Sequence, residues 1–109
     1  MVILSRVLRL ARDGREFEVP IRIHLPIDRK DHWECDYEID WPGGEKRSKA
    51  GGIDSIQALM SAMEKIGSDL YASDAHHSGN LRWERPGGGY GFPLHSAVQD
   101  LYEGDDRSM

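Results

Sequence analysis

A tight turn at Asp13-Gly14, placed between two alternating runs of apolar and polar residues, constrains the fold of this chain more than any other feature. A two-residue type I′ turn needs positive φ at both central residues, and Asp-Gly accepts that conformation. With Arg12 opposite Arg15, the apolar residues of the two runs face one another: Leu10 with Phe17, Leu8 with Val19, Leu4 with Ile23 and Val2 with Leu25. The sequence therefore predicts an antiparallel hairpin with one apolar face.

Arg6 is the charged residue that interrupts this apolar face, where it lies opposite Ile21. An arginine can lay its aliphatic stem across apolar surface while the guanidinium reaches water. We expect Arg6 to do so.

A third strand is predicted at residues 33–41, where the alternation is complete over the whole run. Its apolar face holds Trp33, Cys35, Tyr37, Ile39 and Trp41. Its acidic face holds Glu34, Asp36, Glu38 and Asp40. A turn at Gly43-Gly44 predicts a second hairpin, in which Asp40 lies opposite Arg47 and Glu38 opposite Lys49.

A helix is predicted from about residue 55 to residue 72. Asp54 followed by Gln57 has the spacing of a capping box. The apolar stripe that we expect to face the core consists of Ile53, Ile56, Met60, Met63 and Leu70. Gly67 falls in this stripe, and we expect it to permit a close approach between the helix and the sheet.

The carboxyl-terminal third predicts a short fifth strand at Leu81 and Trp83, then a glycine-rich loop ending at Pro93. Leu94, Val98 and Leu101 suggest a short closing helix, and residues 104–109 are expected to be disordered. The fold class is therefore α+β. We expect one domain, residues 1–103, with an antiparallel meander of four to five strands covered on one face by one long helix.

Composition narrows the function classes. The chain of 109 residues has a formal net charge of -5, which opposes nonspecific binding to nucleic acid. One cysteine cannot form an internal disulfide, which favours a cytoplasmic location. The chain has no apolar run of about twenty residues, so we expect no membrane span.

The acidic strand face could be a catalytic carboxylate pair or a cation-binding surface. Arg22, Arg47 and Lys49 flank it in the expected sheet, which favours a solvated, charge-paired face instead. His32 and Cys35 are an odd number of positions apart on one strand, so they point to opposite faces. We expect no catalytic, metal or cofactor site, and we expect Cys35 to be a buried core residue.

A second candidate surface lies between the end of the helix and the glycine-rich loop. It would combine flexible backbone with two histidines and three aromatic side chains, a composition suited to a contact surface or a small-ligand site. Asp74 and these histidines follow the helix, where cationic histidine interacts favourably with the carbonyl end of the macrodipole. The residues of this surface are His76, His77, Trp83, Tyr90 and Phe92.

The pattern Gly-Ile-Asp-x-x-Gln-Ala-Leu at residues 52–59 and the ending Gly-Tyr-Gly-Phe-Pro at residues 89–93 give the chain a recognisable character. Together with the run CDYEIDWPGG they resemble a bacterial family of domains of unknown function. The resemblance covers most of the chain. It implies a compact cytoplasmic protein and brings no reaction, ligand or catalytic residue with it.

These observations favour a noncatalytic module that binds another protein, or a second copy of itself through an unpaired sheet edge. Lys46 and Lys49 would discourage pairing at the edge they occupy. An immunity-type inhibitor that neutralises a basic toxin through the acidic face is one alternative. A small-ligand protein or an enzyme that uses the region of His76, His77 and the glycine-rich loop is the other.

Overall fold

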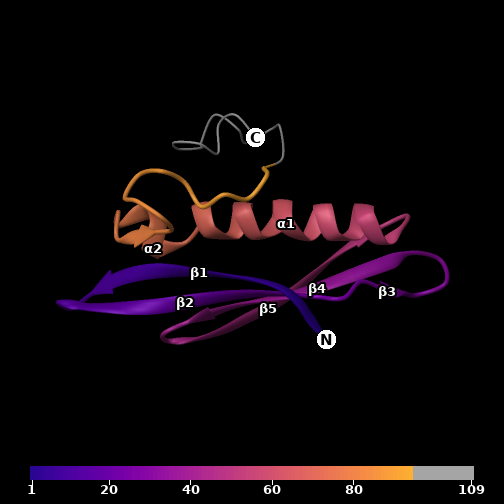
Figure 1. Ribbon diagram of the computed structural model, residues 1–109, viewed down its shortest axis with the longest axis horizontal. Helices are drawn as coiled ribbons and strands as arrows, with labels where there is room; N and C mark the ends of the chain where they lie inside the picture. Colours follow the sequence, from indigo (N-terminus) through magenta and orange to yellow (C-terminus); the bar gives the residue numbers. More distant parts are fainter. Residues whose placement is uncertain (95–109) are drawn as a thin grey trace.

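The computed structural model describes residues 1–94 as an antiparallel sheet with helices on one of its faces (Figure 1). The elements are β1 (Val2–Arg12), β2 (Arg15–His24), β3 (Ile27–Asp28), β4 (Trp33–Trp41), β5 (Gly44–Gly52), α1 (Ser55–Tyr71), α2 (Asp74–His77) and β6 (Leu81–Arg82). The predicted closing helix beyond Leu94 and the predicted tail at 104–109 lie outside the described residues. No helix in the described part is long and apolar enough to cross a membrane.

The strands β1, β2, β4 and β5 form the predicted meander, which confirms the α+β class with an antiparallel sheet. The sheet has six strands rather than four to five, because Ile27–Asp28 pairs with Trp33 and Glu34 of β4 as the short strand β3. The strand β6 joins the free edge of β1, where Leu81 lies opposite Leu10. The sequence alone could not assign that edge.

The first hairpin has the predicted register from Arg12–Arg15 to Leu4–Ile23. The predicted pair of Val2 with Leu25 is wrong, since Val2 lies opposite His24. A register shift between Val2 and Leu4 leaves Ile3 as an extra residue on β1, and such a bulge displaces the pairing beyond it.

Pro20 limits how far β2 can pair with its other neighbour. The β2–β4 ladder covers only Ile21 to Ile23. Proline has no N–H to donate, so it is tolerated where a ladder ends. Pro20 lies opposite Val7 of β1 and is the residue at which the pairing with β4 stops.

The second hairpin turns at Pro42-Gly43, so that Trp41 lies opposite Gly44. The predicted pairs of Asp40 with Arg47 and of Glu38 with Lys49 are therefore wrong. Glu38 lies opposite Arg47 and Asp36 opposite Lys49. Proline has the φ required at the first central position of a β-turn, and this preference overrides the Gly-Gly signal used in the prediction.

The helix α1 begins as predicted and ends one residue earlier, at Tyr71. The Asp54 carboxylate accepts the Gln57 backbone N–H at 2.8 Å, and the Gln57 side-chain oxygen accepts the Ile53 backbone N–H at 2.7 Å. These two bonds satisfy donors that the first turn of any helix leaves unpaired.

The helix presents a different face to the sheet from the predicted one. Its fully buried residues Ala58, Ala62, Ile66 and Leu70 are four apart and pack on the inner sheet face. Ile53, Ile56 and Met60 are instead 84%, 68% and 52% exposed, so that part of the prediction is wrong, whereas Leu70 is buried as expected. Alanine side chains let the helix backbone approach the sheet closely, which larger side chains at those positions would prevent.

Polar contacts fix α1 over β4 and β5. The buried Tyr37 hydroxyl donates to the Asp69 carboxylate, and Lys46 lies 3.2 Å from the same carboxylate. Burial raises the pKa of the Tyr37 hydroxyl, and the bond to Asp69 raises it further. Lys65 donates to the Ser48 hydroxyl at 2.7 Å and to the Lys49 carbonyl at 3.0 Å.

Gly67 is buried as its position suggested, but its close neighbour is not the sheet. A Cβ at this position would lie 2.6 Å from Leu94 Cδ2 and 3.2 Å from the Pro93 carbonyl oxygen. The end of the glycine-rich loop, at Pro93 and Leu94, therefore crosses α1 at Gly67, on a different side of the helix from the sheet.

The close approach of β5 to α1 is tested by alanine at Gly52. A Cβ there would lie 2.4 Å from the Ala58 backbone nitrogen, so we expect Gly52→Ala to lower the free energy of unfolding by about 1–3 kcal/mol. Gly51→Ala is the matched control, because its Cβ would lie 3.6 Å from the nearest atom, the Trp33 carbonyl oxygen. Urea unfolding of both variants measures the difference. Equal stabilities would contradict the described contact.

Candidate functional site

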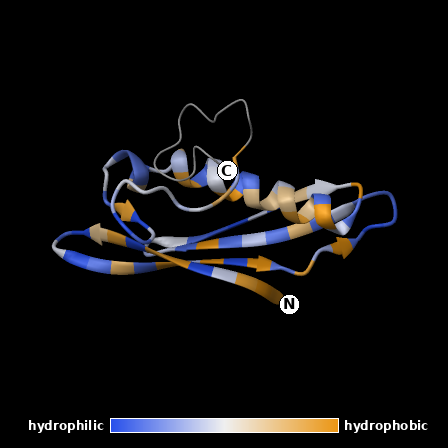
Figure 2. Cartoon of the chain, turned by 45° about the horizontal axis from the view of Figure 1, so that its top comes forward, coloured by the Kyte–Doolittle hydropathy of each residue, from blue (hydrophilic) through white to orange (hydrophobic). Residues whose placement is uncertain are grey.

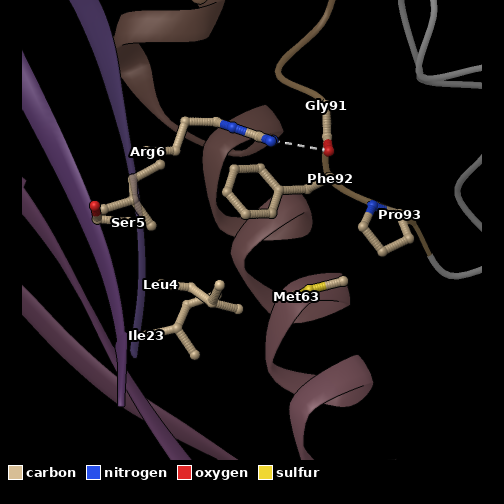
Figure 3. A pocket seen from close by; sticks show the side chains of 9 residues that line it. Leu4, Ser5, Arg6, Ile23, Met63, Gly91, Phe92 and Pro93 are labelled. Atoms are coloured by element: carbon tan, nitrogen blue, oxygen red, sulfur yellow. Dashed lines mark hydrogen bonds between the residues drawn. The ribbon is translucent and has the colours of Figure 1, made fainter. Parts of the chain in front are cut away.

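Arg6 reaches from β1 to the glycine-rich loop and holds it against the sheet. Its Nη1 donates to the Gly91 carbonyl at 2.9 Å (Figure 3). The same nitrogen donates to the Tyr90 carbonyl at 3.1 Å. Its guanidinium carbon lies 3.9 Å from the Trp83 ring centroid and 4.9 Å from that of Phe92. We call this arrangement of Arg6, Trp83, Tyr90, Gly91 and Phe92 the Arg6 clamp.

The clamp corrects the expectation that the Arg6 guanidinium simply reaches water. An arginine between two aromatic faces gains cation–π attraction, and two carbonyl acceptors add charge-assisted hydrogen bonds. The sequence showed that Arg6 interrupts an apolar face. It did not show that Arg6 contacts the glycine-rich loop, which is far along the chain.

Gly91 is required by the clamp for two reasons. Its φ is +77°, a conformation that side chains other than glycine rarely adopt. A Cβ at this position would also lie 2.5 Å from the Trp83 ring and 2.7 Å from Arg6 Nη1. The loop can therefore approach Arg6 only with glycine here.

An apolar cavity lies beside the clamp, between the sheet, α1 and the loop (Figure 3). Its volume is about 260 Å³. Leu4, Ile21 and Ile23 line it from the strands, Met63 from α1, and Phe92 and Pro93 from the loop. Such a cavity suits an apolar side chain or a small apolar molecule.

The predicted surface of two histidines and three aromatics does not come together as one exposed patch. The histidines lie on α2, whose start is capped by Ser73. His76 Nδ1 is 2.5 Å from the Tyr90 hydroxyl, and the Tyr71 ring lies 4.7 Å from His76 and 5.1 Å from Tyr90. Trp83 and Phe92 instead contact Arg6.

The exposure of these side chains determines which of them a partner could contact. Tyr90 is 4% and Phe92 5% exposed, so both belong to the core in this conformation. Trp83 and His76 are half-buried, and His77 is exposed. The geometry thus gives Tyr90 and Phe92 a packing role, and a ligand surface at His76 and His77 stays a prediction.

The acidic residues of β4 lie on the sheet face that points away from α1, which we call the outer face. Glu38 is only 7% exposed there, because Arg22 Nε and His24 Nε2 each lie 2.9 Å from its carboxylate. Arg22 also pairs with Asp40 at 3.2 Å. The outer face is charge-paired, as expected.

The electrostatics of the outer face follow from these pairs. Burial alone would raise the pKa of Glu38, but the hydrogen bonds from Arg22 and His24 outweigh burial and lower it. The pKa of Glu34 is lowered chiefly by its hydrogen bond with His32, with Arg29 and Lys49 adding to the effect. Ionised carboxylates that are already paired offer a basic partner less attraction than unpaired ones.

The described residues contain no group of three or more histidine, cysteine, aspartate or glutamate side chains arranged to hold a metal ion. Cys35 is fully buried and donates to the His24 carbonyl at 3.4 Å.

The sequence prediction missed an exposed apolar surface at the start of α1. Ile56 and Met60 on one side of α1 form an apolar stripe with Ile53, which lies just before the helix. A groove lined by Leu25, Trp33, Ile56 and Leu59 connects this stripe to the end of β2. We call these six residues the apolar end. Figure 2 shows hydrophobic residues near the start of α1, on β3 and at the N-terminus. The spacing of Ala58, Ala62, Ile66 and Leu70 was the signal that could have revealed it.

A family model described as a domain of unknown function, DUF6968, matches residues 4–94. The chain belongs to the DUF6968 family. Every element of the described fold except the first two residues of β1 lies within the DUF6968 match, as do the Arg6 clamp, the apolar end and the charge-paired outer face. No curated protein and no solved structure matches the chain.

The Arg6 clamp is tested by Arg6→Ala. Loss of two charge-assisted hydrogen bonds and two ring contacts should lower the free energy of unfolding by about 2–4 kcal/mol. The loop should also open, so chymotrypsin should cut faster after Tyr90, which is only 4% exposed while the loop is held. Arg9→Ala is the control: Arg9 is on the same strand, 3.6 Å from Glu18, and about half-exposed, so we expect a change within about 0.5 kcal/mol. A variant as stable and as resistant as Arg9→Ala would refute the clamp.

The buried Glu38 carboxylate predicts a pH dependence. Its pKa in the folded protein is below the ordinary value of 4.5, so ionised Glu38 stabilises the fold above that pH, and this contribution is lost as the pH falls through the folded pKa. Glu38→Gln should therefore be less stable than wild type at pH 7, and the difference should shrink as the pH falls below 4.5. Urea unfolding across this range measures it.

Glu18→Gln is the control for this titration, because Glu18 lies on the same face with 61% of its side chain exposed. We expect it to match wild type throughout. A wild-type advantage over Glu38→Gln that does not change with pH would contradict the assignment.

Proposed function

We propose that this DUF6968 protein is a noncatalytic module that binds another protein through the apolar end. The observation that carries the proposal is the exposure of Ile53, just before α1, and of Ile56 and Met60 on one side of the helix. Large apolar side chains exposed singly are common, but a contiguous group rimmed by polar residues marks an interaction surface.

The composition of the apolar end supports this proposal. Its helical stripe is bordered by Asp54, Gln57, Ser61 and Glu64, and its groove contains the half-buried Trp33. Interfaces between proteins combine an apolar centre, often with aromatic and methionine side chains, with a polar rim. The partner would present apolar side chains that enter the groove between Ile56 and Leu25.

The capping bonds of Asp54 and Gln57 make this surface rigid before binding. They fix the first turn of α1, which holds Ile53 and Ile56 in place. A surface that is already ordered loses less conformational entropy when a partner binds.

Paired glutamates at Ile56 and Met60 test the proposal. Because both side chains are exposed, Ile56→Glu with Met60→Glu should leave the free energy of unfolding within about 1 kcal/mol of wild type. The same change should abolish capture of a stoichiometric protein partner from the native cell, since desolvating two carboxylates opposes an apolar interface. Quantitative mass spectrometry of the captured proteins measures the loss.

Gln57→Glu with Ser61→Glu is the matched control, because it also adds two negative charges, places them at the rim and leaves the stripe intact. The partner should remain bound to it. Identical captured proteins from wild type and from the Ile56→Glu, Met60→Glu variant would remove the apolar end as the binding surface.

A further inference from the structure

We propose that two copies of this chain associate through the open edge of β1, with antiparallel pairing of the segment Leu4–Leu8 around a twofold axis. This proposal concerns a surface different from the apolar end, so either can fail without the other. It rests on the backbone of β1, on the side chains along that edge and on the cavity beside it.

The outer edge of β1 is paired over only part of its length. Among the described residues, β6 pairs with β1 at Arg9 and Leu10, and the Ala11 N–H bonds to the Asn80 carbonyl at 3.0 Å. Backbone groups alternate between the two edges of a strand. The N–H and C=O groups of Val7 and Ser5 therefore point to the same edge as those of Ala11, where no described strand meets them.

Pro20 supports this assignment independently. Val7 lies opposite Pro20, which has no N–H. If the backbone groups of Val7 point outward, Val7 and Pro20 form a non-hydrogen-bonded pair of the ladder. The missing N–H of Pro20 then costs no hydrogen bond between β1 and β2. The sequence thus places its proline where the first hairpin does not need a donor.

The side chains along this edge do not prevent another strand from pairing with it. Natural sheet edges are commonly protected by lysine and other charged side chains, and the β5 edge carries Lys46, Arg47 and Lys49. From Val2 to Leu8 the one charged residue is Arg6, and its guanidinium lies in the clamp. Val2, Ile3, Leu4 and Val7 are between 39% and 47% exposed.

A second copy fits this edge better than a charged partner strand. The whole chain has a net charge of -5, which opposes self-association, but the segment 2–8 contains no acidic residue. Two identical antiparallel strands are self-complementary around a twofold axis, which gives a closed dimer. The apolar residues that need cover on one copy are then the ones that the other copy supplies.

The cavity beside the clamp adds a place for side chains of the added strand. Leu4 and Arg6 of β1 line it together with Met63 and Pro93 (Figure 3). In peptide recognition by strand addition, main-chain hydrogen bonds supply affinity and pockets along the edge receive alternate side chains. The apolar lining of this cavity fits an aliphatic side chain such as Leu4 of the second copy.

The paired segment is short, so the dimer buries little surface and should be weak. The bulge at Ile3 ends the regular edge at Leu4, and β6 occupies it from Arg9 onward. Five residues a side bury less than the roughly 1,600 Å² of a standard stable interface. We therefore expect a weak dimer that dissociates on dilution.

Sedimentation equilibrium of the full chain from micromolar to millimolar concentration tests the proposal. The mass should rise from 12.4 kDa toward twice that value. In each register that pairs Ser5 or Val7 of one copy with Ser5 or Val7 of the other, Val7 lies within two residues of the axis. Val7→Lys should then weaken the dimer several-fold, because in each of these registers it places one charge from each copy in a short apolar pairing.

Ala11→Lys is the matched control, since it adds the same charge to the same strand and face where β6 already occupies the edge. It should dimerise as wild type does. Ser5→Lys repeats the test should Val7→Lys fail to fold, as judged by circular dichroism and urea unfolding. The amide protons of Ser5 and Val7 should also exchange more slowly at high concentration.

Three results would overturn the proposal. One is a wild-type chain that stays monomeric at millimolar concentration. Another is a folded Val7→Lys or Ser5→Lys variant that dimerises as strongly as wild type. The third is loss of the dimer in the Ile56→Glu, Met60→Glu variant, which would move the contact between copies to the apolar end.

Discussion

The close contact between the alanine face of α1 and the sheet is the constraint on which the rest of the structure depends. Ala58 and Ala62 are fully buried, and they bring the helix backbone down onto β4 and β5. Ile66 and Leu70 continue the same line of contact. Only one side of a helix can face the sheet. Because the alanine side of α1 does so, Ile53, Ile56 and Met60 are exposed and form part of the apolar end.

The other sides of α1 are secured by different means. Tyr37, Lys46 and Lys65 bind polar groups across the gap between α1 and the sheet, which fixes the rotation of the helix. The loop that ends at Leu94 crosses the helix at Gly67, and the Arg6 clamp holds that loop to β1. On the side away from the sheet, the loop thus covers the later turns of the helix, whereas Ile56 and Met60 of its first turns are exposed.

Local signals in the sequence were enough to predict the two hairpins, the helix start and the charge-paired outer face. Asp13-Gly14 determined the register of the first hairpin, because an Asp-Gly turn leaves few alternatives. The register of the second was missed, since Pro42 competed with Gly43-Gly44 and the proline preference won. Arg6, Gly67 and Gly91 could not be explained from sequence, because the groups that they contact come from segments far along the chain.

The helix face was missed for a physical reason of wider use. A hydrophobicity pattern ranks isoleucine and methionine above alanine, but packing against a sheet also rewards small side chains that permit a short distance. At Ala58 and Ala62, the short distance between helix and sheet outweighed the larger apolar area that isoleucine or methionine would have buried. An exposed stripe of larger apolar residues on the same helix is then a surface that the fold itself does not use.

The orientation of α1 is tested most directly by the reactivity of single cysteines with a water-soluble thiol reagent, in the purified native protein. Cysteine at Ile56 should react nearly as fast as in a free peptide, whereas cysteine at Ala62 should be strongly protected, as the buried native Cys35 should be. That result would place the stripe in solvent and the alanine face on the sheet. Protection at Ile56 with rapid reaction at Ala62 would contradict the account.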